Sequence, residues 1–385
     1  MSAARSAARG LDAFGLDLAR ALEGAPGNLV LSPVSVGLAL AVTWAGARGE
    51  TAAQIGRALR LAEPRAAALE HLAALTTELT RARGRTELHV ATRLFASKRS
   101  GVSPAFQDLG RRVFGTACEG IDFASDPERA RAQINAWTAT ATRDRVRELL
   151  PPRSLDEETR LVLASAVYLK ALWAEPFEAS MTASGPFYTG AEVRQVQKMV
   201  GTKHAARLSI TPGLRAVELP YADGATSLLI VVPDDDERFR ALGRELSPEL
   251  LDEVTAGLSE GSLLLHLPKI DTSEGAAVSL SDALRVLGIE DVLDRTRADL
   301  RTIADPVDAD DRLCVAEAYH QASLRLDEEG TEAAAATAIV FGPFGGPTEP
   351  PLDFDIDRPF YLFVRDTSSG ATLFFGKIRE LPARA

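Results

Sequence analysis

The sequence predicts a mixed α and β (α+β) fold in a single domain that spans residues 1–385. Segments whose apolar side chains recur at helical spacing are interspersed with runs rich in β-branched and aromatic residues, which are typical of strands. No Gly/Ser-rich or Pro-rich linker divides the chain, and no internal repeat is visible. With 46% hydrophobic and 25% charged residues, a chain of this length can bury a sizeable core.

Helices are expected where capping residues precede a helical period. Ser32 followed by Pro33 is typical of a helix start, because a serine hydroxyl caps free N–H groups and proline suits the first helical position. The expected helices are an amphipathic one through Phe14, Leu18 and Leu22, one that starts at Ser32-Pro33, one that starts at Glu50-Thr51, and those over residues 62–83, 104–114, 234–257 and 279–287.

Strands are expected in the apolar runs between these helices. The run 161–174 lacks polar alternation, which indicates a strand that is buried on both faces. The other expected strands are a short one after residue 28, 87–97, 114–123, two runs between 216 and 232 joined by a hairpin turn, 262–270, 316–326, and three short strands between 354 and 381.

Composition excludes several classes of function. The formal charge of −11 and the pI near 5.1 argue against a nucleic-acid binder or a binder of anionic membranes. No apolar run approaches the ~20 residues of a membrane-spanning helix. The N-terminus lacks a secretory signal, so we expect a cytoplasmic protein, or an extracellular one if a leader has been removed. Cys118 and Cys314 lie far apart in apolar segments, which favours free thiols over a disulfide.

No enzyme motif is found in the chain. There is no G-x-S-x-G, H-E-x-x-H, C-x-x-C or G-x-x-x-x-G-K pattern. Histidines are scattered, and none has the spacing of a metal ligand; they are His71, His89, His204, His266 and His320. We therefore expect no catalytic residues, no metal and no cofactor.

The stretch 328–344, EEGTEAAAATAIVFGPF, carries the functional signal. Residues 331–338 include no large side chain, so a strand made from them could enter between two existing strands without a clash. With period two, Thr331, Ala333, Ala335 and Thr337 would share one face of that inserted strand. The alternative interpretation is an Ala-rich surface helix or linker.

This stretch resembles the reactive-loop hinge of the serpins, a family of serine protease inhibitors. The hinge positions are Glu328, Gly330, Thr331, Glu332, Ala333, Ala334, Ala335, Ala336 and Thr337. A serpin-like pattern also runs from Asn28 through Ser32-Pro33 to Gln54, and F-x-I-D-R-P-F at 354–360 is close to another family motif. The resemblance covers almost the whole chain and implies about three β-sheets, eight to nine helices and an exposed reactive loop at about 330–351. Residues 134–150 resemble the serpin helix that crosses the front of the main sheet. The Ala/Arg-rich composition suggests a bacterial member, and the small residues of the hinge suggest an inhibitory one.

The resemblance implies an inhibitor that acts as a suicide substrate, not an enzyme. Its partner would be a serine protease held as a covalent acyl complex by a monomeric inhibitor. Counting fourteen residues from Gly330 places the reactive bond at Phe344-Gly345, with Phe341, Gly342 and Pro343 as subsite contacts. A large aromatic residue suits chymotrypsin-like and subtilisin-like enzymes, and residues 331–356 include no basic residue that would suit trypsin-like ones. A bond after Gly345 or Thr348 is the alternative, because the segment 344–359 is a few residues longer than usual.

The resemblance also implies a hydrogen-bonded "shutter" beneath the main sheet, made by Ser32, Ser35, Ser165 and His320. Position 165 is usually an asparagine in the family, so we expect at least one bond of the usual network to be missing or water-mediated here. Simple N-capping is the alternative role for the two serines near residue 32. The alternative functions are a non-inhibitory serpin, such as a carrier or chaperone, and an inhibitor of papain-like cysteine proteases.

Overall fold

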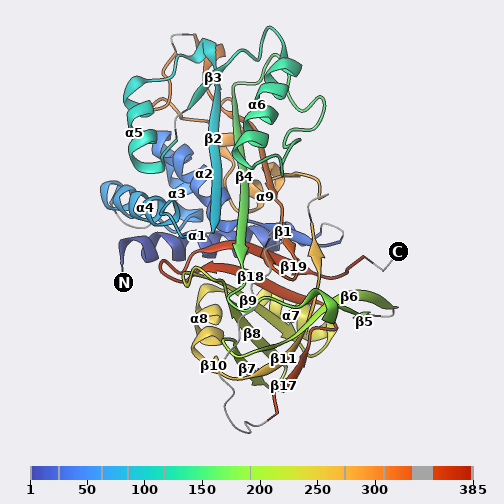
Figure 1. Ribbon diagram of the computed structural model, residues 1–385. Coiled ribbons are helices and arrows are strands. Elements are labelled where there is room, and N and C mark those ends of the chain that lie inside the picture. Colours follow the sequence, from blue (N-terminus) through green and yellow to red (C-terminus); the bar gives the residue numbers. More distant parts are fainter. Residues whose placement is uncertain are drawn as a thin grey trace.

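The computed structural model describes residues 2–24, 27–61, 64–84, 86–116, 118–190, 192–272, 275–306, 308–331 and 350–382. Within these ranges the fold is mixed α and β, with nine α-helices and three sheets, as predicted. Figure 1 shows most of the helices packed around the long strands β2 and β4, with the other two sheets at the opposite end of the molecule. The helices are α1 (Ala3–Ala21), α2 (Pro33–Gly46), α3 (Gly49–Ala58), α4 (Arg65–Leu79), α5 (Pro104–Phe114), α6 (Pro127–Ala141), α7 (Asp236–Glu245), α8 (Pro248–Ala256) and α9 (Ser281–Val286).

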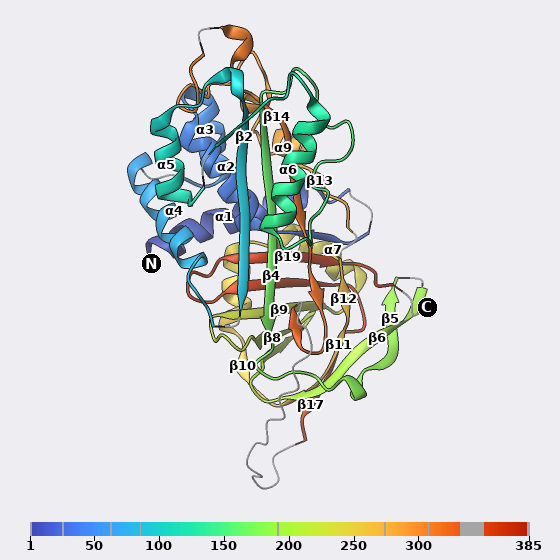
Figure 2. The same ribbon diagram turned by 45° about the horizontal axis from the view of Figure 1, so that its top comes forward.

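An eight-stranded sheet, here called the main sheet, is built around β4. Its strands are β2 (Glu87–Ser97), β3 (Glu119–Ile121), β4 (Leu161–Leu172), β12 (Ile270–Asp271), β13 (Val278–Ser279), β14 (Val315–Ala322), β15 (Arg325–Leu326) and β16 (Gly330–Thr331). Strand β2 pairs antiparallel with one edge of β4, and β14 pairs parallel with the other edge, from Val315 opposite Leu161 to Ala322 opposite Val167. Helix α6 lies across the front of β2 and β4, as expected of the segment that follows residue 134 (Figure 2).

The other two sheets meet at the far end of the main sheet. The seven-stranded sheet has the order β1 (Leu29–Leu31), β19 (Thr372–Ile378), β18 (Phe360–Asp366), β9 (Thr226–Pro233), β8 (Leu214–Pro220), β7 (Arg207–Thr211) and β10 (Ser259–Glu260). The four-stranded sheet has the order β17 (Leu352–Asp355), β11 (Leu263–Pro268), β6 (Glu192–Lys203) and β5 (Ala183–Thr189).

Two local predictions are confirmed with their physical reasons. In β4 all residues except Lys170 and Leu172 are buried, as its continuous apolar sequence requires. Helix α2 begins at Pro33, and the Ser32 side chain accepts a hydrogen bond from the backbone N–H of Ser35 at 3.2 Å. Every residue of this helix is buried, because it is enclosed between the main sheet and the seven-stranded sheet.

Several other predictions of where helices and strands begin and end are wrong. The strand expected over 114–123 is only β3, because α5 runs to Phe114 and Gly115 ends it with a φ of +64°. The helix expected over 234–257 is split into α7 and α8, since Ser247 and Pro248 form a second cap. The front helix ends at Ala141, not near residue 150. Strands β5, β6 and β7 were not predicted.

The structure also tests the predictions about the two cysteines and about membrane-spanning helices. Both cysteines are free; Cys118 is buried and Cys314 is partly buried. Burial raises the pKa of the Cys118 thiol to about 12. None of the helices in the described ranges has the length and apolar character needed to span a bilayer.

Candidate functional site

The described part of the hinge, Glu328–Thr331, is anchored against the end of β4. Thr331 pairs antiparallel with Ala171, and Gly330 pairs with Leu172. Strand β16 thus occupies the edge of β4 just beyond the point where β14 has ended. On the C-terminal side of the predicted loop, β17 pairs with β11 in the four-stranded sheet. The two ends of the loop are therefore fixed in different sheets.

Only glycine fits at position 330. A Cβ added there would stand 2.0 Å from the carbonyl oxygen of Ala171 and 2.8 Å from the Cα of Leu172, at a φ of +156°. Close approach of the hinge backbone to β4 therefore requires the absence of a side chain. This contact gives a physical reason for the glycine of the hinge motif.

Thr331 is held by an aromatic cluster that the sequence analysis missed. Its side chain is 1% exposed, and its Oγ1 lies 2.5 Å from the hydroxyl of Tyr221. Tyr221 in turn stacks on Trp173, with ring centroids 4.6 Å apart and an interplanar angle of 12°. Burial raises the pKa of Tyr221, so its hydroxyl stays protonated and available for this hydrogen bond.

Backbone and charge contacts complete the anchor. The Trp173 backbone N–H donates to the carbonyl of Glu329 at 2.9 Å, and its indole Nε1 donates to the carbonyl of Asp327 at 2.9 Å. The Glu328 carboxylate accepts from Thr182 Oγ1 at 2.6 Å and pairs with Lys269 Nζ at 2.7 Å. Burial by itself raises the pKa of Glu328, but the bonds from these two partners outweigh it and hold the pKa below its usual value.

The four predicted shutter residues are brought together by three elements: α2 and its cap, β4 and β14. His320 lies opposite Ser165 in the parallel register of β14 and β4. Its Nε2 accepts a hydrogen bond from the backbone N–H of Ser32 at 2.9 Å, and its Nδ1 lies 3.1 Å from Ser165 Oγ. Ser165 Oγ is 2.8 Å from Ser35 Oγ, which is 3.4 Å from the carbonyl of Ala166.

These contacts form one connected set of hydrogen bonds around His320. Because Nε2 of His320 accepts, the proton of the neutral imidazole is on Nδ1, and Ser165 offers it two acceptors, the hydroxyl Oγ at 3.1 Å and the carbonyl oxygen at 3.2 Å. The Ser165 hydroxyl can then donate to Ser35, and Ser35 to the backbone of Ala166. Burial lowers the pKa of His320 to about 4, which keeps the ring neutral at pH 7. Ser165 thus contacts two partners directly, and the loss of one bond relative to an asparagine stays a prediction.

Most of the predicted loop lies outside the described residues. This applies to Glu332, Ala333, Ala334, Ala335, Ala336 and Thr337 of the hinge, to Phe341, Gly342 and Pro343, and to the reactive bond Phe344-Gly345. Within the described ranges, no group of three or more His, Cys, Asp or Glu side chains is placed to hold a metal ion.

The fold and the sequence were compared with known proteins. A sequence model of the family Serpin (serine protease inhibitor) matches residues 9–381. The leukocyte elastase inhibitor of Equus caballus is 32% identical over 374 residues, which cover 94% of this chain and 96% of that protein. Iris from Ixodes ricinus is 31% identical over 379 residues, which cover 96% and 97%.

Solved structures agree with these relatives. Serpin48, a highly specific serpin in the insect Tenebrio molitor, has a similar crystal structure with a TM-score of 0.84, 27% sequence identity and 97% of both chains covered. The family match covers nearly the whole chain, and its relatives include named protease inhibitors, so the assignment is to inhibitors of proteases and not to enzymes. The chain belongs to the serpin family of serine protease inhibitors.

Proposed function

We propose that the protein inhibits chymotrypsin-like or subtilisin-like serine proteases as a suicide substrate. The protease serine attacks the carbonyl of Phe344, Gly345 leaves with the new amino terminus, and the protease stays attached to Phe344 as an acyl-enzyme. The freed hinge then enters the main sheet between β4 and β14. A relative that is named as an elastase inhibitor supports a protease as the partner.

The pairing of Gly330 and Thr331 with the end of β4 is the observation that carries this proposal. If the antiparallel register continues, Thr337 comes to lie opposite Ser165, six residues further along each strand from the Thr331–Ala171 pair. That edge of β4 is paired with β14 from Leu161 to Val167. Insertion therefore requires β14 to separate from β4.

The shutter lies directly in the path of the inserting strand. The contact between Ser165 and His320 joins β4 to β14 at the position that Thr337 would reach. Ser32 and Ser35 tie the same pair of strands to the start of α2. We assign these four residues the role of holding the main sheet closed until cleavage.

Insertion supplies enough free energy to trap the protease. About ten residues, 332–341, would fill the edge of β4 down to Leu161 and would form ladders with both β4 and β14. At ~0.5–1.5 kcal/mol net for each bond, the gain after loss of the β4–β14 pairing is on the order of 10 kcal/mol. This is comparable to the stability of a whole domain, so it can distort the active site of the attached protease.

The loop sequence sets the class of protease. Phe344 would fill a deep apolar primary pocket, and Phe341 and Pro343 suit an extended groove. Residues 331–356 include no Lys or Arg, which disfavours trypsin-like enzymes. The proposed bond can be shifted to Gly345 or Thr348 without a change in this mechanism.

Separate incubations with chymotrypsin, with subtilisin and with papain test the proposal. We expect a complex that survives SDS, at the summed mass of the inhibitor and the protease, and a released fragment whose N-terminal sequence starts at Gly345. A different N-terminus would relocate the bond. Fast cleavage without a complex would indicate a non-inhibitory serpin, and a complex with papain alone would indicate an inhibitor of cysteine proteases.

A variant of the hinge separates trapping from cleavage. Thr337→Arg would bring an unpaired charge opposite Ser165, which is buried, when the strand enters the sheet, at a cost of several kcal/mol. Cleavage should stay fast while the complex disappears. Thr211→Arg, at an exposed position on β7, is the matched control and should still trap the protease. Equal trapping by both variants would exclude insertion that brings Thr337 opposite Ser165.

We also propose that the chain works as one domain and as a monomer. Light scattering of the purified protein should give the mass of one chain. One cooperative thermal transition should accompany it.

A further inference from the structure

The main chain of the hinge is held by a short segment, residues 173–177, which we call the clamp segment. The backbone N–H of Trp173 donates to the carbonyl of Glu329 at 2.9 Å, and the backbone N–H of Phe177 donates to the carbonyl of Glu328 at 2.8 Å. Beyond Trp173 the clamp segment belongs to no helix or strand, so regular secondary structure does not fix the position of the second donor. The position of the hinge therefore depends on what holds the clamp segment.

Lys203, the last residue of β6, supplies this hold. It is 3% exposed, and its ammonium group donates to the carbonyl of Glu175 at 2.5 Å and to the carbonyl of Pro176 at 2.9 Å. The same ammonium group lies 3.5 Å from the centroid of the Phe177 ring, which is within the range of a cation–π interaction. One side chain thus contacts three consecutive residues of the clamp segment.

A carboxylate of the clamp segment reaches back to the end of β6. The Glu175 side chain accepts hydrogen bonds from the backbone N–H of His204 at 2.7 Å and from that of Ala205 at 3.3 Å. Lys203 therefore binds carbonyl groups of the clamp segment, while the clamp segment binds N–H groups next to Lys203. A shift of the clamp segment would break several of these bonds at once.

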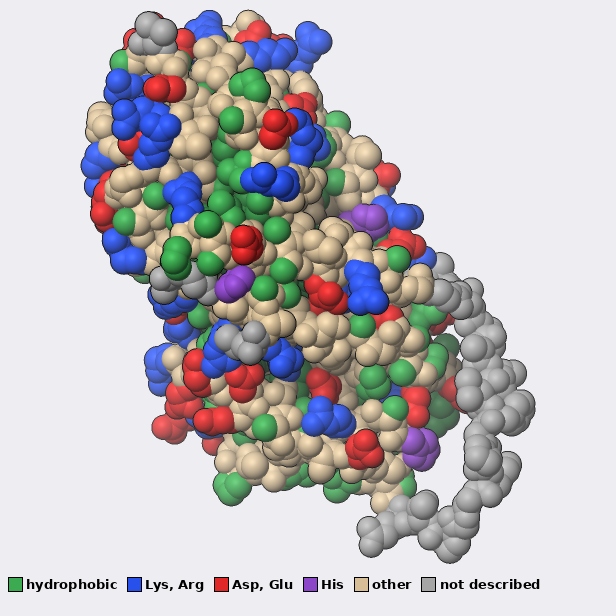
Figure 3. Space-filling view, turned by 90° about the vertical axis from the view of Figure 1, so that its left-hand side faces the viewer, with side chains coloured by type: hydrophobic (Ala, Val, Ile, Leu, Met, Phe, Trp, Pro, Cys, Tyr) green, Lys and Arg blue, Asp and Glu red, His purple; other side chains and the backbone are tan. Residues whose placement is uncertain are grey.

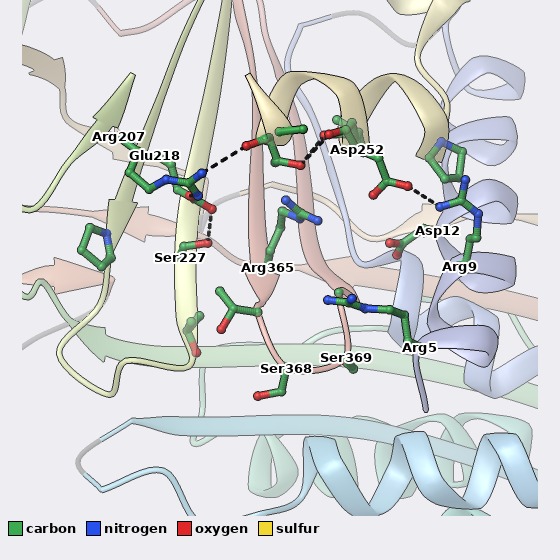
Figure 4. Close-up of a pocket in the computed structure, with 18 of the residues that line it drawn as sticks. Arg5, Arg9, Asp12, Arg207, Glu218, Ser227, Asp252, Arg365, Ser368 and Ser369 are labelled. Atoms are coloured by element: carbon green, nitrogen blue, oxygen red, sulfur yellow. Dashed lines mark hydrogen bonds and ion pairs between the residues drawn. The ribbon is translucent and has the colours of Figure 1, made fainter. Parts of the chain in front are cut away.

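Lys203 differs from the other buried lysines in having no carboxylate partner among the described residues. The other two in these ranges, Lys198 and Lys377, each form an ion pair with a carboxylate. Arg207, on the strand that follows β6, pairs with Glu218 at 2.9 Å (Figure 4). On the face of the molecule in Figure 3, positive and negative side chains are likewise interspersed. The acceptors of Lys203 are main-chain carbonyl groups, so its charge acts on the clamp segment itself.

Lys203 stays charged in this position at neutral pH. Burial lowers its pKa to about 8, and the nearby Glu175 carboxylate acts in the opposite direction, so most molecules carry the proton at pH 7. A buried charge is costly unless its hydrogen bonds are made. Hydrogen bonds from a charged donor are about twice as strong as those between neutral groups. A neutral side chain of the same length would therefore hold the two carbonyl groups less firmly.

Given the proposed inhibitory function, we propose that Lys203 is a positioning residue that keeps the clamp segment in place, so that the hinge stands at the edge of β4 before the loop is cleaved. After cleavage, the acyl-enzyme is either trapped by entry of the hinge or hydrolysed by water, and the faster step decides. A hinge that is already held at Glu328 and Glu329 enters without a search for its register. Loss of Lys203 should slow this entry and leave the attack on the loop unchanged.

Hydrogen–deuterium exchange of the full chain, measured by mass spectrometry, tests the hold without a protease. Lys203→Met nearly keeps the length of the side chain but removes its charge and its donors. In this variant the amides of Trp173 and Phe177 should exchange at least tenfold faster than in the parent. Lys98→Met, at an exposed position, is the matched control and should exchange like the parent. Unchanged exchange of the clamp segment in Lys203→Met would overturn the proposal.

Titration of chymotrypsin and of subtilisin measures the effect on trapping. The number of inhibitor molecules consumed for each protease trapped should rise at least threefold in Lys203→Met, while the rate of loop cleavage should stay within twofold of the parent. A residue that merely supported the fold would not separate these two quantities. If the number of inhibitor molecules consumed stayed at the parent value in spite of faster exchange, Lys203 would not position the hinge for entry.

Two controls keep the outcomes distinct. Exchange in β9 reports whether a variant is folded. If Lys203→Met does not fold, Lys203→Gln, which keeps a neutral donor, decides by the same two measurements, and parent-like values in both would overturn the proposal. If the parent itself traps no protease, the proposed function fails, whereas exchange of the clamp segment still decides whether Lys203 holds the hinge.

Discussion

The hydroxyl pair of Thr331 and Tyr221 offers a direct test of how the hinge is anchored. Thr331→Val keeps the shape of the side chain but removes the partner of the buried Tyr221 hydroxyl, which lies 2.5 Å away. Tyr221→Phe removes the same bond from the other side and leaves the ring stacked on Trp173. A buried group that loses its partner costs about 1–3 kcal/mol, whereas removal of both partners is nearly neutral. Each single variant should therefore be destabilised by about 1–3 kcal/mol, and the double variant by less than the sum.

Scanning calorimetry at one fixed scan rate measures the effect. An unfolding entropy of ~2.1 cal/mol/K per residue over this chain amounts to ~0.8 kcal/mol/K, so each single change should lower the midpoint by about 1–4 °C. The double variant should unfold no lower than the single variants, which is a coupling of about 1 kcal/mol or more. Thr211→Val, on the exposed part of β7, is the control. Strictly additive losses in the double variant would refute the hydrogen bond as the anchor.

Three further predictions concern the loop and two buried ionisable groups. Cleavage between Ala338 and Pro347 should raise the midpoint by about 12 °C, because insertion contributes on the order of 10 kcal/mol; equal midpoints before and after proteolysis would exclude insertion. His320 has a folded-state pKa lowered to about 4 by burial, so the unfolded chain binds a proton first and stability should fall by about 2 kcal/mol between pH 6.5 and pH 5. His320→Gln should lack that part of the slope in urea titrations, and an unchanged slope would mean that the ring is protonated in the folded state. Burial raises the pKa of Asp12 to about 7, so its ionisation lowers the stability of the folded protein as the pH rises from about 4 to 7. The stability of Asp12→Asn should therefore exceed that of the parent by more at pH 8 than at pH 5. A difference in stability that does not depend on pH would contradict this.

Local signals in the sequence determined several elements and the hinge. The cap at Ser32 and Pro33, the doubly buried strand β4 and the limits of β2 and α5 follow from contacts within one or two turns or from the period of the apolar side chains. The hinge could also be predicted from the sequence, because its signal is a glycine followed by a run without large side chains. Where a boundary was missed, as at Ser247 between α7 and α8, a second cap interrupted a continuing helical period.

Only the tertiary structure decided which distant residues meet. Trp173 and Tyr221 reach the hinge across more than 100 residues of sequence, Trp173 at Asp327 and Tyr221 at Thr331, and no periodicity connects them. The direction of the hydrogen bonds through His320 depends on the register of β14 against β4, which shifts at a bulge after Val315. Such contacts depend on how sheets and helices pack against each other, and local sequence patterns do not specify them.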